Sequence, residues 1–191
     1  MEDRNQMLDG LVRPHRLLNA AFAVLIAVMA GHEAEHVAQV AQKNTLGRDC
    51  PGECRGLLGF IFDLEWIHMA YNASILAALL GLLVAYRLWR PEWHRAAAMC
   101  WGCLVAGIAV QCYHVVEHTV KIAQWATNGH VEPTPGILGQ LLPPPRGHEF
   151  SLIELHFTFN TVVFVLVVAG FFGLGIARHT VPRPAVALAG R

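Results

Sequence analysis

Two related stretches of the chain determine how it is organised. Residues 32–42 read His-Glu-Ala-Glu-His-Val-Ala-Gln-Val-Ala-Gln, and residues 114–124 read His-Val-Val-Glu-His-Thr-Val-Lys-Ile-Ala-Gln. Five of these eleven positions are identical at an offset of 82 residues. A weaker match relates residues 68–72 (His-Met-Ala-Tyr-Asn) to residues 156–160 (His-Phe-Thr-Phe-Asn) at an offset of 88. The sequence therefore predicts two tandem units, each with His-x-x-Glu-His on a first helix and His-x-x-x-Asn on a second.

Each motif adjoins a long run without charged residues. Met69–Tyr86 and Ala96–Tyr113 are 18 residues long, and Phe157–Ala177 is 21 residues long. About 20 apolar residues, each rising ~1.5 Å, are needed to cross ~30 Å of hydrocarbon, so these runs predict transmembrane helices. The first apolar run, Leu17–Gly31, has only 15 residues, but the repeated motif extends it to Gln42. Only 15% of the 191 residues are charged, whereas soluble domains carry about 25%.

The first apolar run also has an alternative interpretation as a signal peptide. Arg13 and Arg16 would form its basic region, Leu17–Ala27 its apolar region, and Val28–Ala30 a small-residue cleavage site. The repeat favours a membrane helix instead, because the second copy of the motif lies on a clear span at 96–126.

We therefore predict an all-α integral membrane protein, a four-transmembrane-helix bundle built from a tandem repeat of two helix pairs. With two spans per repeat, the halves run in the same sense about an axis along the membrane normal. The predicted segments are a cytoplasmic N-terminal segment 1–16; a first repeat 17–95 with helices at about 17–42 and 57–88 and an outer loop 43–56; a second repeat 96–178 with helices at about 96–126 and 149–178 and a Pro-rich outer loop 127–148; and a cytoplasmic tail 179–191.

The distribution of positive charge predicts the orientation. Nine of the 14 Lys and Arg residues lie on the side of both termini, and five lie on the side of the two loops. The positive-inside rule therefore places both termini in the cytoplasm, in a multi-pass protein of the cell membrane. The 14 basic residues are balanced by 14 acidic ones, so there is no basic excess to attract nucleic acid.

The repeated histidines fall at one depth, roughly 10–16 Å below the outer boundary at ~1.5 Å per residue. Positions i, i+3 and i+4 of a helix share a face, so each His-x-x-Glu-His motif can point into the bundle as a unit. A charged side chain at mid-depth costs ~2.5–3.5 kcal/mol, and bound cations would neutralise the carboxylates. The expected metal ligands are His32, Glu35, His36, His68, His114, Glu117, His118 and His156.

Two divalent transition-metal ions fit this number of ligands better than one. Carboxylates beside imidazoles suit iron, zinc or manganese, and a mostly histidine site also suits copper. Iron is our first choice, with copper or zinc as alternatives. Glu65 and Glu154 are the expected catalytic residues, as proton-handling groups or additional ligands. Asp63 lies just nearer the outer face, and Glu33 lies on an adjacent side of the first helix.

The remaining polar groups carry weaker expectations. Asn72 and Asn160 are expected to form helix–helix hydrogen bonds or to orient ligands. Cys50 and Cys54 are expected to form a small disulfide in the first outer loop, with a second metal-binding spot as the alternative. Cys100 and Cys103 have redox-type spacing but lie inside a span, which favours packing. Packing is also the expectation for Cys112, with support of the metal site as the alternative.

Two resemblances accompany these motifs. His32-Glu33-Ala34-Glu35-His36 satisfies the His-Glu-x-x-His pattern and its inverted form, and so resembles the intramembrane zinc proteases. In that family an aspartate motif follows the zinc helix, whereas Leu8-Asp9-Gly10 precedes it here. The overall design resembles the membrane di-iron desaturases and hydroxylases, although their His-x-x-His-His boxes are absent. No motif identifies a family.

The functional expectation is a metal-dependent membrane oxidoreductase of oxygenase, hydroxylase or desaturase type. Its partners would be the lipid bilayer, a lipophilic substrate entering from it, a redox partner and a second copy of the chain. The principal alternative is transport or handling of metal ions or protons. Two further alternatives are an intramembrane zinc hydrolase and a haem protein with two histidine ligands. Haem ligation does not require the flanking carboxylates, which counts against that alternative.

Overall fold

The computed structural model describes residues 2–12, 15–47, 54–59, 65–130, 134–141 and 152–180. Within these ranges the chain is almost entirely helical and contains no strand. The elements are α1 (Glu2–Val12), α2 (Arg16–Asn44), α4 (Glu65–Ala85), α5 (Pro91–Thr127), the short α6 (Leu138–Leu141), α7 (Leu152–Gly173) and a 3-10 helix, η2 (Ile176–His179).

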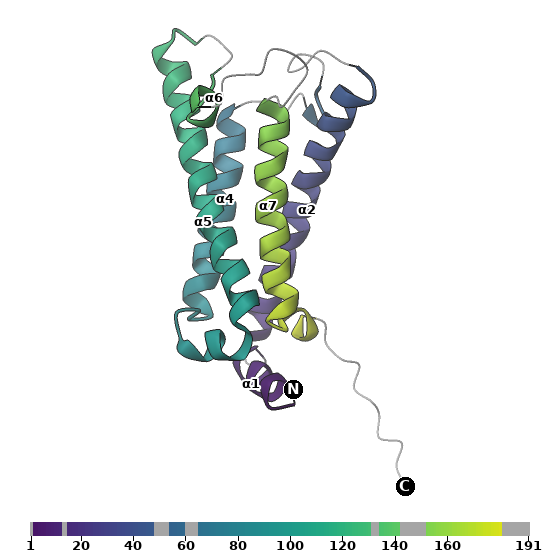
Figure 1. The fold of residues 1–191 in the computed structure, drawn as a ribbon, viewed down its shortest axis with the longest axis vertical. Helices are drawn as coiled ribbons and strands as arrows, with labels where there is room; N and C mark the ends of the chain where they lie inside the picture. The colour runs from purple at the N-terminus through teal and green to yellow at the C-terminus, as the bar shows by residue number, and fades with distance from the viewer. Residues whose placement is uncertain are drawn as a thin grey trace.

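The four long helices α2, α4, α5 and α7 run side by side along the length of the molecule (Figure 1). We call the end where α2 and α5 finish the loop end; α6 lies there (Figure 1). The opposite end, where α2 begins, is the terminal end. Each of the four helices is long and apolar enough to span a membrane, so the prediction of four such helices is confirmed.

The outer surface of the bundle is apolar along these helices. Val24 of α2, Val84 of α4, Met99 of α5 and Val165 of α7 all have exposed side chains. The helices instead bury polar residues, among them Gln111, His114 and Asn160. A bundle that exposes apolar groups and buries polar ones is suited to a hydrocarbon environment rather than to water.

Helices α5 and α7 approach each other closely where glycines replace larger residues. A Cβ atom on Gly170 would lie 2.7 Å from Cβ of Leu104, and a Cβ atom on Gly107 would lie 3.1 Å from Cγ2 of Val167. Small residues at such positions let helix backbones pack at short range, as in membrane helix pairs. This contact fixes the helix carrying the second His-x-x-Glu-His motif against the helix carrying His156.

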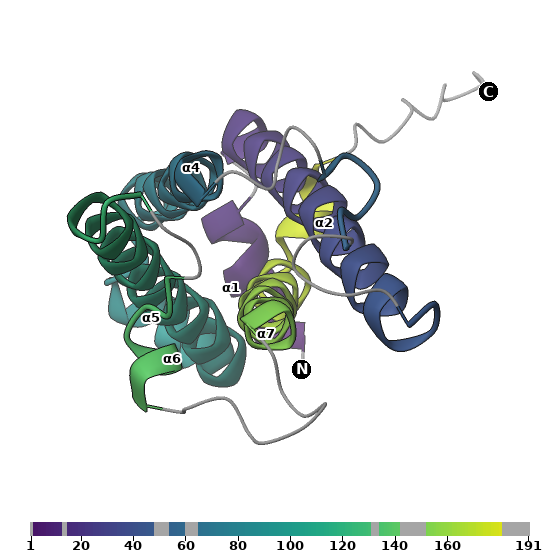
Figure 2. The same ribbon diagram turned by 90° about the horizontal axis from the view of Figure 1, so that it is seen from above.

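The terminal end is closed by α1, which crosses beneath the bundle (Figure 2). Asn19 of α2 donates to the carbonyl of Val12 over 3.2 Å and accepts a 2.5 Å hydrogen bond from the hydroxyl of Tyr86. The indole of Trp93 donates to the carbonyl of Tyr86 over 3.1 Å. Burial raises the pKa of Tyr86, so its hydroxyl remains a donor. The predicted N-terminal segment 1–16 therefore contains a packed helix, which its low hydrophobicity did not indicate.

Two helix boundaries differ from the predicted ones. The second helix was expected from about residue 57, but residues 56–58 form a turn and α4 begins at Glu65. The third was expected from residue 96, but α5 begins at Pro91, whose fixed φ suits the first turn of a helix. A kink at Ala97 (φ −158°, ψ 64°) joins this added turn to the membrane-length part of α5.

Candidate metal centre

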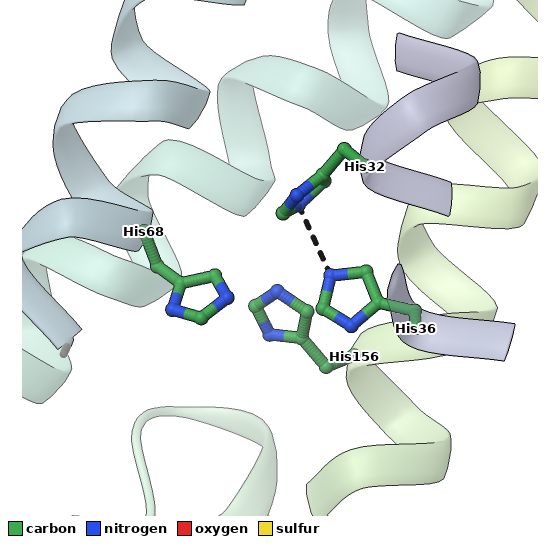
Figure 3. A group of neighbouring side chains, drawn as sticks. All are labelled: His32, His36, His68 and His156. Atoms are coloured by element: carbon green, nitrogen blue, oxygen red, sulfur yellow. Dashed lines mark hydrogen bonds between the residues drawn. The ribbon is translucent and has the colours of Figure 1, made fainter. Parts of the chain in front are cut away.

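Six histidines from the four long helices gather towards the loop end in two overlapping clusters. The four-histidine cluster consists of His32, His36, His68 and His156. The three-histidine cluster consists of His114, His118 and His156. Within each cluster the candidate ligand nitrogens all lie within 4.8 Å of one another. Figure 3 shows the first cluster, in which the imidazoles converge from different helices. All six histidines that the sequence predicted as ligands thus belong to a cluster that could hold a metal ion.

His156 lies at the centre of this arrangement and belongs to both clusters. Its ring centroid is 4.7 Å from that of His36 and 5.2 Å from that of His68. It is also 4.9 Å from the ring centroids of both His114 and His118. One imidazole therefore connects the ligands of α2 and α4 with those of α5.

Within each His-x-x-Glu-His motif the two histidines face each other through the same ring atoms. Nε2 of His32 lies 3.0 Å from Nε2 of His36, and Nε2 of His114 lies 3.1 Å from Nε2 of His118. Ligand atoms about 2.0–2.1 Å from a shared metal ion are separated by about 3 Å, so these distances fit two ligands of one ion.

Hydrogen bonds at the other ring nitrogens fix two tautomers. Nδ1 of His36 donates to Oε1 of Gln39 over 2.8 Å, and Nδ1 of His118 donates to Oε1 of Glu65 over 2.5 Å. Because these oxygens act as acceptors, each Nδ1 carries the proton and each Nε2 presents a lone pair. A metal-binding imidazole is oriented by this kind of hydrogen bond. The second Glu65 oxygen pairs with Nζ of Lys121 over 2.6 Å.

Two buried ring nitrogens have no hydrogen-bond partner among the described residues. They are Nδ1 of His114 and Nε2 of His156. Buried polar atoms are normally paired, and an unpaired one marks a missing water, ion or ligand. The unpaired atom of His156 lies on the residue that the two clusters share.

The two glutamates of the repeated motif bind backbone amides of the loop-end turns. The Glu35 carboxylate accepts hydrogen bonds from the backbone N–H of Leu57 at 2.9 Å and of Leu58 at 3.0 Å. The Glu117 carboxylate accepts from the backbone N–H of Leu138 at 3.1 Å. Turn amides in an apolar setting need acceptors, and these carboxylates supply them. Both were predicted as metal ligands, but the structure places them as anchors of the two loop-end turns.

A glutamine and a glycine complete each anchor. Gln42 exchanges two hydrogen bonds with the backbone of Gly56, at 2.8 and 2.9 Å, and Gln124 does the same with Gly136, at 3.2 and 2.8 Å. We call Glu35 with Gln42 and Gly56 the first clamp, and Glu117 with Gln124 and Gly136 the second clamp.

The sequence analysis missed the two clamp glycines. Their signal is the match between Gly-Leu-Leu-Gly at 56–59 and Gly-Ile-Leu-Gly at 136–139. The two glycines have φ of 65° and 69°, and a Cβ atom on either would lie 2.1 Å from Oε1 of the clamp glutamate. Each turn therefore requires glycine for two reasons: its backbone angle is left-handed, and the nearby carboxylate leaves no room for a Cβ atom.

The asparagines of the second motif also make matching contacts. Nδ2 of Asn72 donates to the carbonyl of His68, and Nδ2 of Asn160 donates to the carbonyl of His156, both at 3.0 Å. Asn72 additionally lies 3.3 Å from Nε2 of His118 and accepts a 3.0 Å hydrogen bond from Gln111. Gln111, which the sequence analysis did not single out, therefore connects α5 to the asparagine next to the ligands.

The other predicted site residues lie outside the two clusters. Glu154 forms a 2.6 Å ion pair with Lys43, which joins α7 to α2. Glu33 accepts a 2.5 Å hydrogen bond from Thr161. Cys54 is disulfide-bonded, and Cys50, its predicted partner, lies outside the described residues, as does Asp63. The remaining described cysteines are free: Cys100, Cys103 and Cys112.

A small pocket adjoins the three-histidine cluster. Its volume is about 30 Å³, enough for a water molecule or a molecule of similar size. All three histidines of that cluster line it, together with Glu117, Lys121, Pro135, Leu155 and Phe159. His114 stacks on Phe159, with ring centroids 5.5 Å apart and planes 21° apart.

These observations describe an apolar helical bundle whose histidine clusters could hold metal ions. Comparison with family models, with curated proteins and with solved structures finds no match to this chain.

Proposed function

We propose that this chain is an integral membrane metalloprotein that binds two transition-metal ions through its six-histidine layer and acts as an oxidoreductase on a lipophilic substrate. The observation that carries the proposal is the convergence of six imidazoles from four helices into two clusters that share His156, with the candidate ligand atoms of each cluster within 4.8 Å of one another. Two of those imidazoles have a buried nitrogen that no described protein group satisfies. Metal coordination would satisfy Nε2 of His156, the residue that the two clusters share.

The chemistry of the donors supports a metal with affinity for imidazole. Glu35 and Glu117 bind backbone amides, and among the described residues the two groups that could hold a metal ion consist of ring nitrogens alone. Imidazole suits copper, zinc, iron and nickel, whereas carboxylate-rich sites suit harder ions. We therefore place copper ahead of iron, whereas iron was the first choice when the carboxylates were counted as ligands.

A purely structural histidine layer is disfavoured by the cost of burying polar groups. A polar group moved into an apolar setting without a hydrogen bond costs about 1–3 kcal/mol in proteins. The lysines nearest the layer, Lys43 and Lys121, are paired with Glu154 and Glu65 and therefore do not serve as partners for the imidazoles.

Matching contacts in the two halves support the tandem repeat within this proposal. The paired Nε2 atoms, the two clamps and the two asparagine–carbonyl bonds recur with the same atoms. Two related helix pairs that meet at one histidine layer account for all of these contacts.

The protein's own residues would perform three tasks in such an enzyme. The histidines would bind the ions, and Gln39 and Glu65 would orient His36 and His118. The two clamps would hold the loop-end turns over the layer and limit the access of water. A redox-active ion bound here would supply electron-transfer chemistry that no side chain of the layer offers. Glu65 contacts a proposed ligand directly, whereas Glu154 forms an ion pair with Lys43 and accepts a hydrogen bond from Asn44.

The test is to purify the full chain in lipid nanodiscs and measure its metal content and electron paramagnetic resonance spectrum before and after reduction with ascorbate. We expect about two redox-active ions per chain, with a spectrum that changes on reduction. The double variant His36→Ala/His118→Ala should lose both the metal and the signal. The control variant His94→Ala/His130→Ala, which alters exposed histidines outside the clusters, should keep them. Bound zinc without a redox signal, or metal flux in liposomes without tight binding, would contradict the oxidoreductase proposal.

A further inference from the structure

We infer that the two clusters form unequal metal sites, and that the three-histidine cluster is the reactive one, with an open coordination position that faces the pocket. The ligand for that position is a molecule of two or three atoms, such as dioxygen or azide. The inference rests on the proposed function, because it assigns different tasks to two parts of the same metal centre.

The number of ligands is the first reason for the inequality, which it supports in two of the three ways of assigning His156. If His156 contributes to both sites, the clusters offer four and three imidazoles. If His156 serves only the first, they offer four and two, and if it serves only the second, they offer three and three. A site with four protein ligands is closed, whereas a site with three keeps a position for water or substrate. The second cluster never offers more imidazoles than the first.

The pocket is the second reason. It is lined by His114, His118 and His156, but by none of the three histidines that belong to the four-histidine cluster alone. With about 30 Å³ it has room for a diatomic or triatomic molecule. The Phe159 ring forms an apolar wall beside His114, and Glu117 and Lys121 are its charged lining residues.

The third reason is that different groups accept hydrogen bonds from the proposed ligands His36 and His118. Residues 39 and 121 are equivalent positions at the repeat offset of 82. In the first half, the amide of Gln39 accepts directly from His36. In the second half, Lys121 instead pairs with Glu65, and the Glu65 carboxylate accepts from His118. A carboxylate behind a ligating histidine makes the imidazole a more basic ligand than an amide does. The two halves therefore differ in the group that accepts a hydrogen bond from a proposed ligand, which is an amide in the first half and a carboxylate in the second.

Cobalt(II) substitution with azide as the probe tests this assignment, because the visible spectrum of cobalt(II) reports its coordination number. The full chain in nanodiscs is loaded with cobalt and titrated with azide. We expect two cobalt ions per chain, of which one responds to azide. His114→Ala should abolish the azide response, and His32→Ala should preserve it. His94→Ala serves as the control, and circular dichroism reports the helical content of each variant.

A variant that leaves every ligand in place makes the test independent of ligand loss. Leu155→Trp would fill the pocket, because Leu155 is one of its lining residues. We expect this variant to bind two cobalt ions and to bind azide at least about 10-fold more weakly. An azide response that survives His114→Ala, disappears in His32→Ala, or is unchanged in Leu155→Trp would overturn the inference while leaving metal binding intact. Failure of the wild-type chain to bind cobalt would instead contradict the proposed metal centre itself.

Discussion

Nδ1 of His118 donates a 2.5 Å hydrogen bond to Oε1 of Glu65, across the interface between α5 and α4. The same carboxylate pairs with Lys121, so the hydrogen-bond acceptor of this proposed ligand is part of an ion pair. Glu154 offers a direct comparison, because it forms an ion pair of equal length with Lys43.

Glu65→Gln should weaken metal binding by the three-histidine cluster by about 10- to 100-fold, the usual effect of losing such a supporting carboxylate. Glu154→Gln should have little effect on affinity, because the ion pair that it removes joins Glu154 to Lys43 and not to a proposed ligand. Competition with a chelator of known affinity measures both variants. Equal losses in the two variants would show that the effect comes from general destabilisation.

Glu35→Gln and Glu117→Gln should destabilise the fold without removing metal. Each carboxylate accepts charge-assisted hydrogen bonds from turn amides, and such bonds contribute about 1.5–3 kcal/mol. Thermal unfolding in detergent should therefore shift downwards, while the metal-to-protein ratio stays at the wild-type value. A fall in that ratio in the folded variants would restore these glutamates to the ligand set that the sequence predicted.

Gly136→Ala should cost more stability than Gly129→Ala. The two glycines have nearly the same backbone angle, φ 69° and φ 68°, so both substitutions carry the penalty of about 1–2 kcal/mol for a left-handed residue. A Cβ atom at Gly129 meets open space, but one at Gly136 would lie 2.1 Å from Oε1 of Glu117. The difference between their unfolding temperatures isolates the clamp contact. Equal temperatures would mean that the second clamp adds nothing to stability.

Val165→Asp should reduce accumulation of the protein in membranes. Val165 is exposed near the middle of α7, and a charge at mid-depth of a membrane helix costs about 2.5–3.5 kcal/mol. Leu141→Asp, which places the same charge on an exposed residue of α6 at the loop end, should be tolerated. Quantitative blotting of membrane fractions compares the two. Normal insertion of Val165→Asp would argue that α7 does not face lipid.

The helices and the histidine layer could be predicted because their signals are local. Uncharged runs such as Phe157–Ala177 indicate a membrane helix by length alone, and the structure confirms four helices that are long and apolar enough to span a membrane. The spacing of His114 and His118 places both on one helical face, and the structure brings their Nε2 atoms to 3.1 Å.

The hydrogen-bond partners of the two motif glutamates could not be predicted in this way. Helical spacing shows that Glu35 shares a face with His32, but it does not show that the chain returns at Leu57 to present its amides to the carboxylate. That meeting depends on a left-handed turn at Gly56, whose importance becomes visible only when residues 56–59 are aligned with 136–139. Likewise, Asn72 and Gln111 meet only because α4 packs against α5.

The most direct test of the metal centre is the metal content of His156→Ala, because His156 is the one imidazole common to both clusters. Elemental analysis of the wild-type chain, His156→Ala and His94→Ala, each purified in nanodiscs with matched helical content, provides the comparison. We predict about two ions per chain in the wild type and in His94→Ala, and fewer than one in His156→Ala. Two ions retained in a folded His156→Ala variant, or none in the wild type, would contradict a metal centre built on this histidine layer.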